Sequence, residues 1–291
     1  MSPAAAADLP HDALWPRAGS WPAAVAGERS DVVLVGIPTH TRSLSPTQAH
    51  LTPAAVREAL QRYSLETAGL RIVDAGDAVD PDAVDAAPWI ASLEADLMIA
   101  IGGDNSATVP VALGRGARGL VTVDAHHDLR DGVSNGSPVR QLIEAGIAGT
   151  SIVQVGIEPL ANSREYAARA ADLGITVVLR DELRRRPIAD LMAEALELAG
   201  SGGREVHVDL DVDVCDRSVA PGCPASVPGG ISAMELRTAA RVAGLHPDVV
   251  SIDLTEVDAA ADAPDGRTVR LTALCVLEAV RARVELIEDG A

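Results

Sequence analysis

Short apolar runs alternate with longer amphipathic segments along most of this chain. Runs rich in β-branched residues predict strands, and several are apolar at nearly every position, which is typical of strands covered on both faces. The predicted strands are 32–36, 70–73, 97–101, 119–123, 151–155, 176–179, 205–210 and 249–254. The segments with helical spacing of apolar residues are 53–63, 163–173, 188–199, 233–243 and 268–285.

Regular alternation of strand and helix predicts an α/β fold in which a mainly parallel sheet of about eight strands carries helices on both faces. No internal repeat or linker divides residues 31–291, so they are predicted to form a single domain. Residues 1–30 are rich in Ala and Pro and show no periodicity. We therefore expect them to form a loosely structured N-terminal arm.

Composition narrows the possible partners. The chain has 291 residues, 47% of them hydrophobic and none of them Phe, so its core must be built from Ala, Val, Leu and Ile. No apolar run approaches the roughly 18 residues of a membrane span, and the N-terminus does not resemble a signal peptide. Three cysteines without paired spacing favour the cytoplasm. A net charge of −18 argues against nucleic acid as a partner. It would suit a cationic small-molecule substrate or a metal, and an acidic surface that keeps the protein in solution is the alternative explanation.

Four polar clusters each follow a predicted strand. They are GGDNS at 102–106, DAHHD at 124–128, DVDVCD at 211–216 and DLTEVD at 253–258. Ligand sites in open α/β sheets gather beyond the carboxyl ends of the strands. Taken singly, each cluster is also compatible with a capped strand-to-helix turn or a solvated strand end, so their shared position is what makes them candidates for one site.

The cluster at 124–128 has the residue types of a metal site. If the chain stays extended there, Asp124, His126 and Asp128 lie on one side. Carboxylates combined with imidazole suit Mn²⁺, Zn²⁺ or Fe²⁺.

The aspartates at the end of the predicted strand 205–210 and just after it bring like charges together. By alternation Asp209, Asp211 and Asp213 share one face, where they repel one another unless a cation, protonation or water neutralises them. The two clusters together predict a cation site at the ends of two strands.

In combination, the four clusters resemble the ureohydrolase family of arginases, agmatinases, guanidinobutyrases and formimidoylglutamases. They occur in the family's order, and the resemblance covers roughly residues 30–285. It implies a single three-layer α/β/α domain of arginase-like fold. It also implies two Mn²⁺ ions bridged by a hydroxide that attacks a C=N carbon, and a homo-oligomer, a trimer or hexamer.

The resemblance also implies roles for individual residues. Asp124 and Asp211 correspond to bridging carboxylates, His126 and Asp213 complete one metal site, and Asp128 serves the other. Two adjacent cations lower the pKa of a bridging water. Asp128 is placed to accept or relay a proton, and Glu256 corresponds to the carboxylate that contacts the C–N group of the substrate.

Two asparagines depart from the family pattern. Asn105 stands where relatives usually have a histidine that completes the first metal site, so this position is expected to be weak, labile or empty. His127 should point away on an extended chain and is not a natural substitute. Asn135 stands where several relatives carry a proton-shuttling histidine, and we assign it to substrate binding.

Local sequence favours the formimidoylglutamase subgroup. DLR at 128–130, GSPVRQ at 136–141, GIEPLANS at 156–163 and APGCPA at 220–225 are similar to that subgroup's segments. N-formimidoyl-L-glutamate carries two carboxylates, for which Arg130 and Arg140 are the expected partners. Ordinary surface ion pairing is the alternative role of these arginines.

The sequence therefore predicts a metal-dependent hydrolase that converts N-formimidoyl-L-glutamate to L-glutamate and formamide, a reaction of histidine degradation. One alternative is an agmatinase or guanidino-acid hydrolase. Another, suggested by Asn105 and Asn135, is a family member that has lost catalysis and serves as a binding or regulatory subunit.

Overall fold

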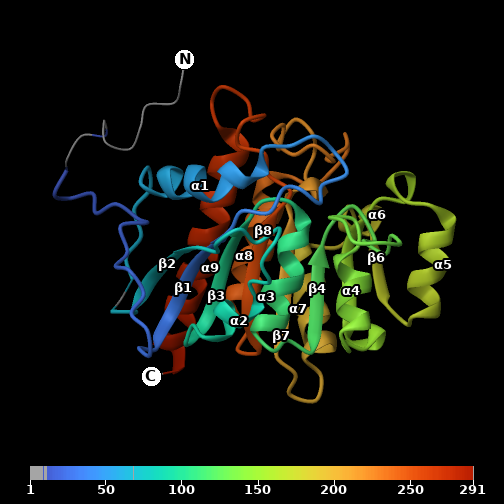
Figure 1. The fold of residues 1–291 in the computed structure, drawn as a ribbon, viewed down its shortest axis with the longest axis horizontal. Coiled ribbons are helices and arrows are strands. Elements are labelled where there is room, and N and C mark those ends of the chain that lie inside the picture. The colour runs from blue at the N-terminus through green and yellow to red at the C-terminus, as the bar shows by residue number, and fades with distance from the viewer. Residues whose placement is uncertain (1–8, 10–11, 68, 291) are drawn as a thin grey trace.

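The computed structural model describes residue 9, residues 12–67 and residues 69–290. They contain one eight-stranded sheet in the order β2-β1-β3-β8-β7-β4-β5-β6, with every neighbouring pair parallel (Figure 1). The strands are β1 (Ser30–Ile37), β2 (Ile72–Asp77), β3 (Ala95–Gly102), β4 (Gly119–Val123), β5 (Ile152–Ile157), β6 (Thr176–Leu179), β7 (Val206–Asp211) and β8 (Val249–Thr255). The predicted parallel α/β sheet is confirmed.

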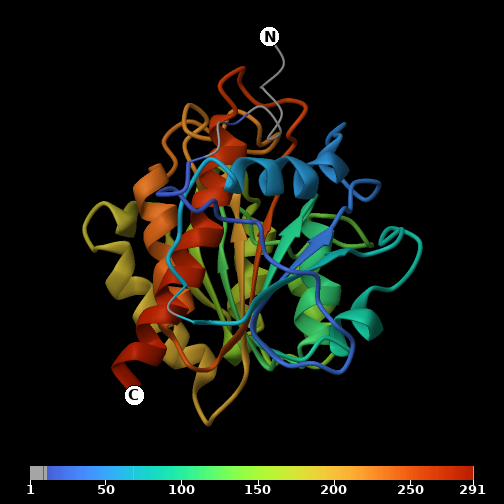
Figure 2. The ribbon, with the colours of Figure 1, turned by 90° about the vertical axis from the view of Figure 1, so that its left-hand side faces the viewer.

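Helices cover both faces of the sheet and make three layers, which Figure 2 shows with the sheet between them. One face packs against α1 (Thr52–Leu60), α7 (Ile188–Gly200), α8 (Ala233–Leu245) and α9 (Arg267–Gly290). The other packs against α2 (Ala87–Ala91), α3 (Thr108–Gly114), α4 (Pro138–Glu144) and α5 (Arg164–Asp172). A further short helix, α6 (Arg180–Leu183), follows β6.

The helices that the sequence did not predict are all short. α2, α3, α4 and α6 have seven residues or fewer, so a 3.6-residue period cannot repeat often enough to be recognised. The five predicted helices all form, with ends that differ by a few residues.

The core is aliphatic, as a chain without Phe requires. Strand residues alternate between the two layers: on β4, Leu120 packs with α4 while Val121 and Val123 pack toward α7, and all three are fully buried. α8 and α9 pack very closely because Gly244 lacks a side chain. A Cβ there would lie 2.5 Å from the carbonyl oxygen of Ala279.

Residues 12–29 form no helix or strand beyond a single bridge between Ala23 and Asp74 on β2. The remainder of the predicted arm, residues 1–8 and 10–11, lies outside the described residues. No helix in the described part of the chain is both long and apolar enough to cross a membrane.

Candidate metal centre

The four polar clusters follow four strands that are neighbours in the sheet. In the order β3-β8-β7-β4, these strands lead into Asn105, Glu256, Asp211 and Asp124 respectively. Because all four strands are parallel, their carboxyl ends meet at one edge of the sheet. Segments separated by up to about 150 residues in sequence therefore converge on one place.

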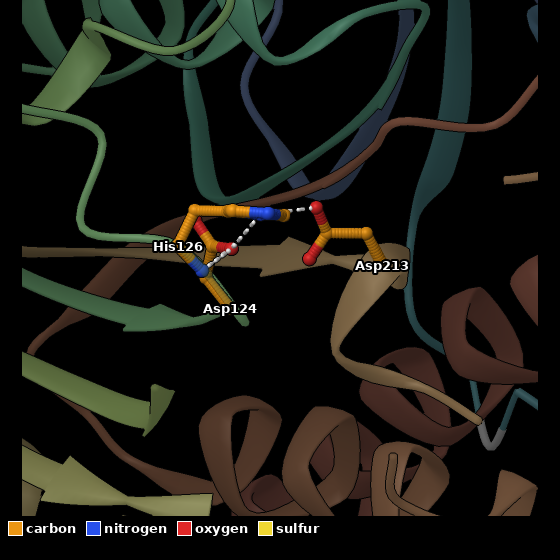
Figure 3. Close-up of side chains that lie close together, drawn as sticks. All are labelled: Asp124, His126 and Asp213. Carbon is orange, nitrogen blue, oxygen red and sulfur yellow. Dashed lines mark hydrogen bonds and ion pairs between the residues drawn. The ribbon is translucent and has the colours of Figure 1, made fainter. Parts of the chain in front are cut away.

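Asp124, His126 and Asp213 form the first half of the centre, which we call the histidine position. Each offers one ligand atom, and these atoms lie within 4.8 Å of one another. The Nδ1 atom of His126 is 2.7 Å from a carboxylate oxygen of Asp213 and 3.6 Å from one of Asp124 (Figure 3). Both carboxylates are buried.

Asp124, Asp128 and Asp211 form the second half, which we call the asparagine position. Their ligand atoms also lie within 4.8 Å of one another. The side-chain amide of Asn105 lies against this group, and its Nδ2 donates hydrogen bonds to Asp128 (2.7 Å) and Asp211 (3.1 Å). Asp124 belongs to both positions.

The acidity of the carboxyl groups differs between the two positions. Burial, with repulsion from Asp213, raises the pKa of Asp124 to about 7. Burial and the neighbouring carboxylates raise the pKa values of Asp128 and Asp211 well above their usual range. Burial would also raise the pKa of Asp213, but the adjacent His126 outweighs it and holds this pKa below its usual range.

His126 is the basic group of the cluster, and the carboxylates around it favour its charged form. The charge of Asp213 raises the pKa of His126 to about 12, although burial opposes the change. The carboxylates that lack such a neighbour are stabilised only by protons, hydrogen bonds or a cation.

The donor set fits a divalent metal ion. Asp124 is fully buried, and its Oδ2 has no hydrogen-bond partner among the described residues. A buried carboxylate oxygen without a partner is costly unless a cation contacts it. Carboxylate oxygens with one imidazole nitrogen suit Mn²⁺ among the common divalent metals.

The chain does not reach this arrangement by strand alternation, as the sequence predicted. After β4 the backbone turns, with the amide of His126 donating to Asp124 at 2.6 Å, and Asp128 has a φ of 53°. After β7 a 3-10 turn begins, with the amide of Asp213 donating to Asp211 at 2.8 Å. The prediction of extended backbone was wrong because each first aspartate accepts a hydrogen bond from the residue two positions on.

Asp209 and Asp211 both lie on β7, two positions apart, and the 3-10 turn that begins at Val212 separates Asp213 from them. Asp209 lies deeper in the sheet, 3.3 Å from the Thr255 hydroxyl, and burial together with Asp253 on β8 raises its pKa well above the usual range. The predicted shared face is therefore confirmed for Asp209 and Asp211 and corrected for Asp213, which lies in the turn. His207 lies in the same buried group, 3.3 Å from Asp253.

Glu256 lies beside the asparagine position and is held by two donors. Its Oε1 accepts the backbone amide of Asn105 at 2.8 Å and the side-chain amide of Asn135 at 2.7 Å. Burial raises its pKa to about 8. Asn135 also accepts the backbone amide of Leu44 at 3.0 Å, so it connects Glu256 to the loop after β1.

Two of the predicted residues have left-handed backbones. Asp128 has a φ of 53° and Glu256 a φ of 60°, and among described non-glycine residues only Asp80 shares this region. Such conformations persist where the surrounding structure imposes them, which is common at functional sites.

A cavity of about 390 Å³ opens over both metal positions. Arg130 lines it, and its side chain packs over Gly136, where a Cβ would lie 2.6 Å from the arginine Cδ. The Arg130 guanidinium makes no hydrogen bond or ion pair with the residues that the structure describes. Asn162 and Tyr166 also line the cavity.

Arg140 is not among the residues that line this cavity. Its guanidinium donates to the carbonyl oxygen of Arg130 at 2.7 Å, to that of Gly132, and to the Glu144 carboxylate. Its donors are thus used to hold the loop that carries Arg130. The structure in this way differs from the prediction that both arginines face the substrate.

His127 behaves as the sequence predicted. It is buried and turned away from the centre, with Nδ1 2.7 Å from the Gln154 side chain on β5.

Several supporting residues were missed. Asn162 accepts the amide of His127 at 3.0 Å and donates to Ala125 at 2.8 Å, which fixes the loop after β4. It lies in the 156–163 segment that carries the subgroup resemblance. Thr108 and Thr255 contact Asn105, and nothing in their sequence context signals that role.

Comparison with known proteins identifies the family. Residues 30–281 match the Arginase family. A formimidoylglutamase from Bacillus subtilis strain 168 is 30% identical, in an alignment that covers 85% of this chain and 86% of that protein. Its crystal structure superposes with a TM-score of 0.85 at 28% identity, covering 98% of this chain and 96% of that one.

Two other relatives show the breadth of the similarity. A guanidinopropionase from Pseudomonas aeruginosa is 30% identical, in an alignment that covers 97% of each chain. A formiminoglutamase from Trypanosoma cruzi, solved with Mn²⁺, superposes with a TM-score of 0.78 at 25% identity, covering 88% of this chain and 94% of that one. The predicted kinship with formimidoylglutamases is confirmed, and the chain belongs to the arginase family.

Proposed function

We propose that the chain hydrolyses the C–N bond of a linear amidine, converting N-formimidoyl-L-glutamate and water to L-glutamate and formamide. The observation that carries this proposal is the buried cluster of Asp124, His126, Asp128, Asp211 and Asp213 beneath a cavity that also contains Glu256 and Arg130. The similarity to formimidoylglutamases supports the choice of substrate.

We assign two Mn²⁺ positions to the cluster. Asp124, His126, Asp211 and Asp213 would hold one ion, and Asn105, Asp124, Asp128 and Asp211 the other. When bound, the ions would lower the pKa of a coordinated water and make a nucleophile available near neutral pH.

Glu256 is the residue that we assign to orienting the amidine. Its Oε1 is fixed by the donors on Asn105 and Asn135, and its carboxylate accepts a hydrogen bond from the amidine N–H. This contact sets the formimidoyl carbon over the cluster. Positioning of this kind contributes because the reacting atoms are held in a productive geometry.

Asp128 is the residue that we assign to proton transfer. The oxygen of water becomes the formamide oxygen, and the bond between the formimidoyl carbon and the glutamate nitrogen breaks. A carboxyl oxygen of Asp128 takes a proton from the attacking water and gives it to the departing nitrogen, while the other water proton ends on the formamide nitrogen. Asp128 suits this role because its carboxyl belongs to the cluster and lines the cavity in which the substrate would lie.

Arg130 is the residue that we assign to the substrate's carboxylates. Its guanidinium has donors to spare at the cavity, and a planar guanidinium suits a carboxylate. Asn135 contributes indirectly, since it connects Glu256 to the loop after β1.

A guanidino-acid hydrolase is the second candidate. The similarity to a guanidinopropionase favours it, and a guanidino acid would use the same arginine for its carboxylate. Agmatine has no carboxylate and would leave Arg130 without a partner.

For assembly and location we propose a cytoplasmic homo-oligomer, a trimer or hexamer, on the strength of the family resemblance. The three cysteines are free and buried. Light scattering on the eluting protein measures the number of subunits.

The direct test is an assay of the purified, Mn²⁺-supplemented protein with N-formimidoyl-L-glutamate, measuring formamide and glutamate. We expect turnover of this substrate to exceed that of guanidinopropionate, guanidinobutyrate and agmatine. Turnover of a guanidino compound without any of formimidoylglutamate would overturn the proposed substrate. The Asp128→Asn variant distinguishes this activity from a contaminant, because it should be inactive.

A further inference from the structure

The side-chain amide of Asn105 lies between groups of opposite hydrogen-bonding character. Its Nδ2 faces the carboxylates of Asp128 and Asp211, at 2.7 and 3.1 Å. Its Oδ1 faces two hydroxyls, those of Thr108 at 2.6 Å and Thr255 at 3.2 Å. All these side chains are buried, and of them only Asp128 and Asp211 line the cavity.

The threonine hydroxyls can exchange their roles as hydrogen-bond donors and acceptors, whereas ionised carboxylates cannot. A threonine hydroxyl both donates and accepts, so Thr108 and Thr255 can receive an amide N–H as readily as they donate to an amide oxygen. Carboxylates can only accept when ionised. The two ends of an amide have nearly the same shape, so a half-turn of the Asn105 amide fits the same space.

A cation in the asparagine position would change which end of the Asn105 amide is favoured beside Asp128 and Asp211. Without a cation, the amide N–H groups of Asn105 face Asp128 and Asp211 and donate to them. With a cation between them, the oxygen is attracted and the amide N–H groups are repelled. The hydroxyl side accommodates both states, since only its protons need to move.

The reversed state also completes a hydrogen-bond chain. The Thr255 hydroxyl lies between the Asn105 amide and the Asp209 carboxyl, at 3.2 and 3.3 Å, and it has one proton to donate. When the amide oxygen of Asn105 faces this hydroxyl, its single proton can be donated to Asn105 or to Asp209, but not to both. Facing an amide N–H, it accepts from Asn105 and donates to Asp209, and both contacts are satisfied.

We propose that Asn105 is a two-position ligand whose amide rotates by half a turn when a metal ion enters the asparagine position, and that Thr108 and Thr255 are positioning residues that make this rotation possible. This inference rests on the proposed metal centre and deepens it. Thr108 on α3 and Thr255 on β8 would then affect the metal affinity of the asparagine position and leave that of the histidine position unchanged.

The first test measures Mn²⁺ binding to Thr108→Val and Thr255→Val, which keep the shape of the side chain and remove the hydroxyl. Calorimetric titration and electron paramagnetic resonance resolve the two ions. We expect affinity at the asparagine position to fall about tenfold in each variant, because a rotated amide would leave an N–H without an acceptor. The histidine position should keep its affinity.

Matched variants separate positioning from general damage. Thr122→Val removes another buried hydroxyl of the sheet, one with no partner among the described residues, and should leave both affinities unchanged. Thr108→Ser and Thr255→Ser keep the hydroxyl and should restore binding. An equal loss at both positions, no loss at either, or the same loss in Thr122→Val would overturn the proposal.

The second test observes the amide directly and does not depend on any variant folding. Neutron diffraction on the deuterated wild-type protein distinguishes Nδ2, which carries two deuterons, from Oδ1, which carries none. We expect Nδ2 toward Asp128 after metal removal by a chelator and toward Thr108 after Mn²⁺ loading. The same orientation in both crystals would overturn the proposal.

The two proposals fail separately. A rotating amide in a protein that does not turn over formimidoylglutamate would remove the proposed substrate and keep the ligand assignment. Turnover of formimidoylglutamate with a fixed amide would do the reverse.

Discussion

The two halves of the centre share Asp124 but balance their charge in different ways. At the histidine position, His126 lies against Asp213 and its pKa is raised to about 12, so an imidazolium can neutralise the carboxylate. At the asparagine position, Asn105 offers only an amide dipole, and the pKa values of Asp128 and Asp211 are raised instead.

This difference bears on how each half takes up a metal ion. An ion at the histidine position must displace a proton from a basic nitrogen and gains an imidazole ligand in return. An ion at the asparagine position displaces protons from carboxyl groups and gains a neutral amide oxygen. We therefore propose that the centre contains a strong and a weak position, and that Asn105 accounts for the difference.

Removing Asp124, a carboxylate assigned to both metal positions, should have the largest effect. Asp124→Asn weakens both positions, and we expect activity to fall about a thousandfold or more, since metal ions contribute several kcal/mol to such reactions. Metal content measured by mass spectrometry should fall with it. Asp172→Asn, on the exposed surface of α5, is the control. Full activity in Asp124→Asn would contradict the assignment of this residue to both positions.

Removing one unshared carboxylate should separate the two halves. Asp213→Asn should lower Mn²⁺ affinity at the histidine position, and Asp128→Asn at the asparagine position, each by about 10- to 100-fold or more. Competition titrations against a metal-sensitive dye measure both constants. If each variant lowers the Mn²⁺ affinity of both positions equally, the two positions bind metal as one unit, and the proposed difference between them is wrong.

The raised pKa values also predict how stability depends on pH. Asp124 and Glu256 keep protons up to about pH 7 and 8 in the folded chain, whereas the unfolded chain releases them near pH 4. The stability that these protons provide is complete below pH 4 and is lost as pH rises through 7 and 8.

The measurement is thermal unfolding after chelation, between pH 6 and pH 9. We expect Tm to fall on this rise, by about 2–4 °C for each kcal/mol lost. Saturating Mn²⁺ should reduce the fall, because the ions replace the protons. A metal-free protein more stable at pH 9 than at pH 6 would contradict the predicted sign.

The smallest effect is expected from a residue outside both positions. Arg130→Ala should raise KM for formimidoylglutamate about tenfold, because a charged hydrogen bond to the substrate is lost. Mn²⁺ binding and kcat should change little. Arg140→Ala is the informative partner, since it should lower Tm by loosening the loop of Arg130. The assignment of Arg130 would fail if its removal changed metal content and left KM unaltered.

Much of the fold could be predicted because parallel strands buried on both faces leave a clear pattern. Every predicted strand forms, and the four polar clusters follow neighbouring strands because β8 and β7 lie between β3 and β4. The sequence could not show that neighbourhood directly, since strand order depends on tertiary packing. The sequence showed only that each cluster follows a strand, and the family resemblance implied that the clusters form one site.

The details of side-chain direction could not be predicted. Asn105 faces Thr255, which lies 150 positions away in sequence. Arg140 was expected at the substrate, but the loop carbonyls nearby take its donors. The turns at Asp124 and Asp211 arise from local hydrogen bonds that compete with extended backbone. In each case an interaction outside the periodic pattern decides the geometry.

The two metal positions should differ in affinity because one has Asn105 in place of histidine, and Mn²⁺ titration of the wild-type protein beside Asn105→His measures this difference. We predict two ions of unequal affinity in the wild type, and a gain of about tenfold or more in Asn105→His at the weaker position alone, because imidazole is the better ligand. Two equal affinities in the wild type, no bound ion at all, or a gain in affinity at the histidine position would show that Asn105 does not make one metal position weaker than the other.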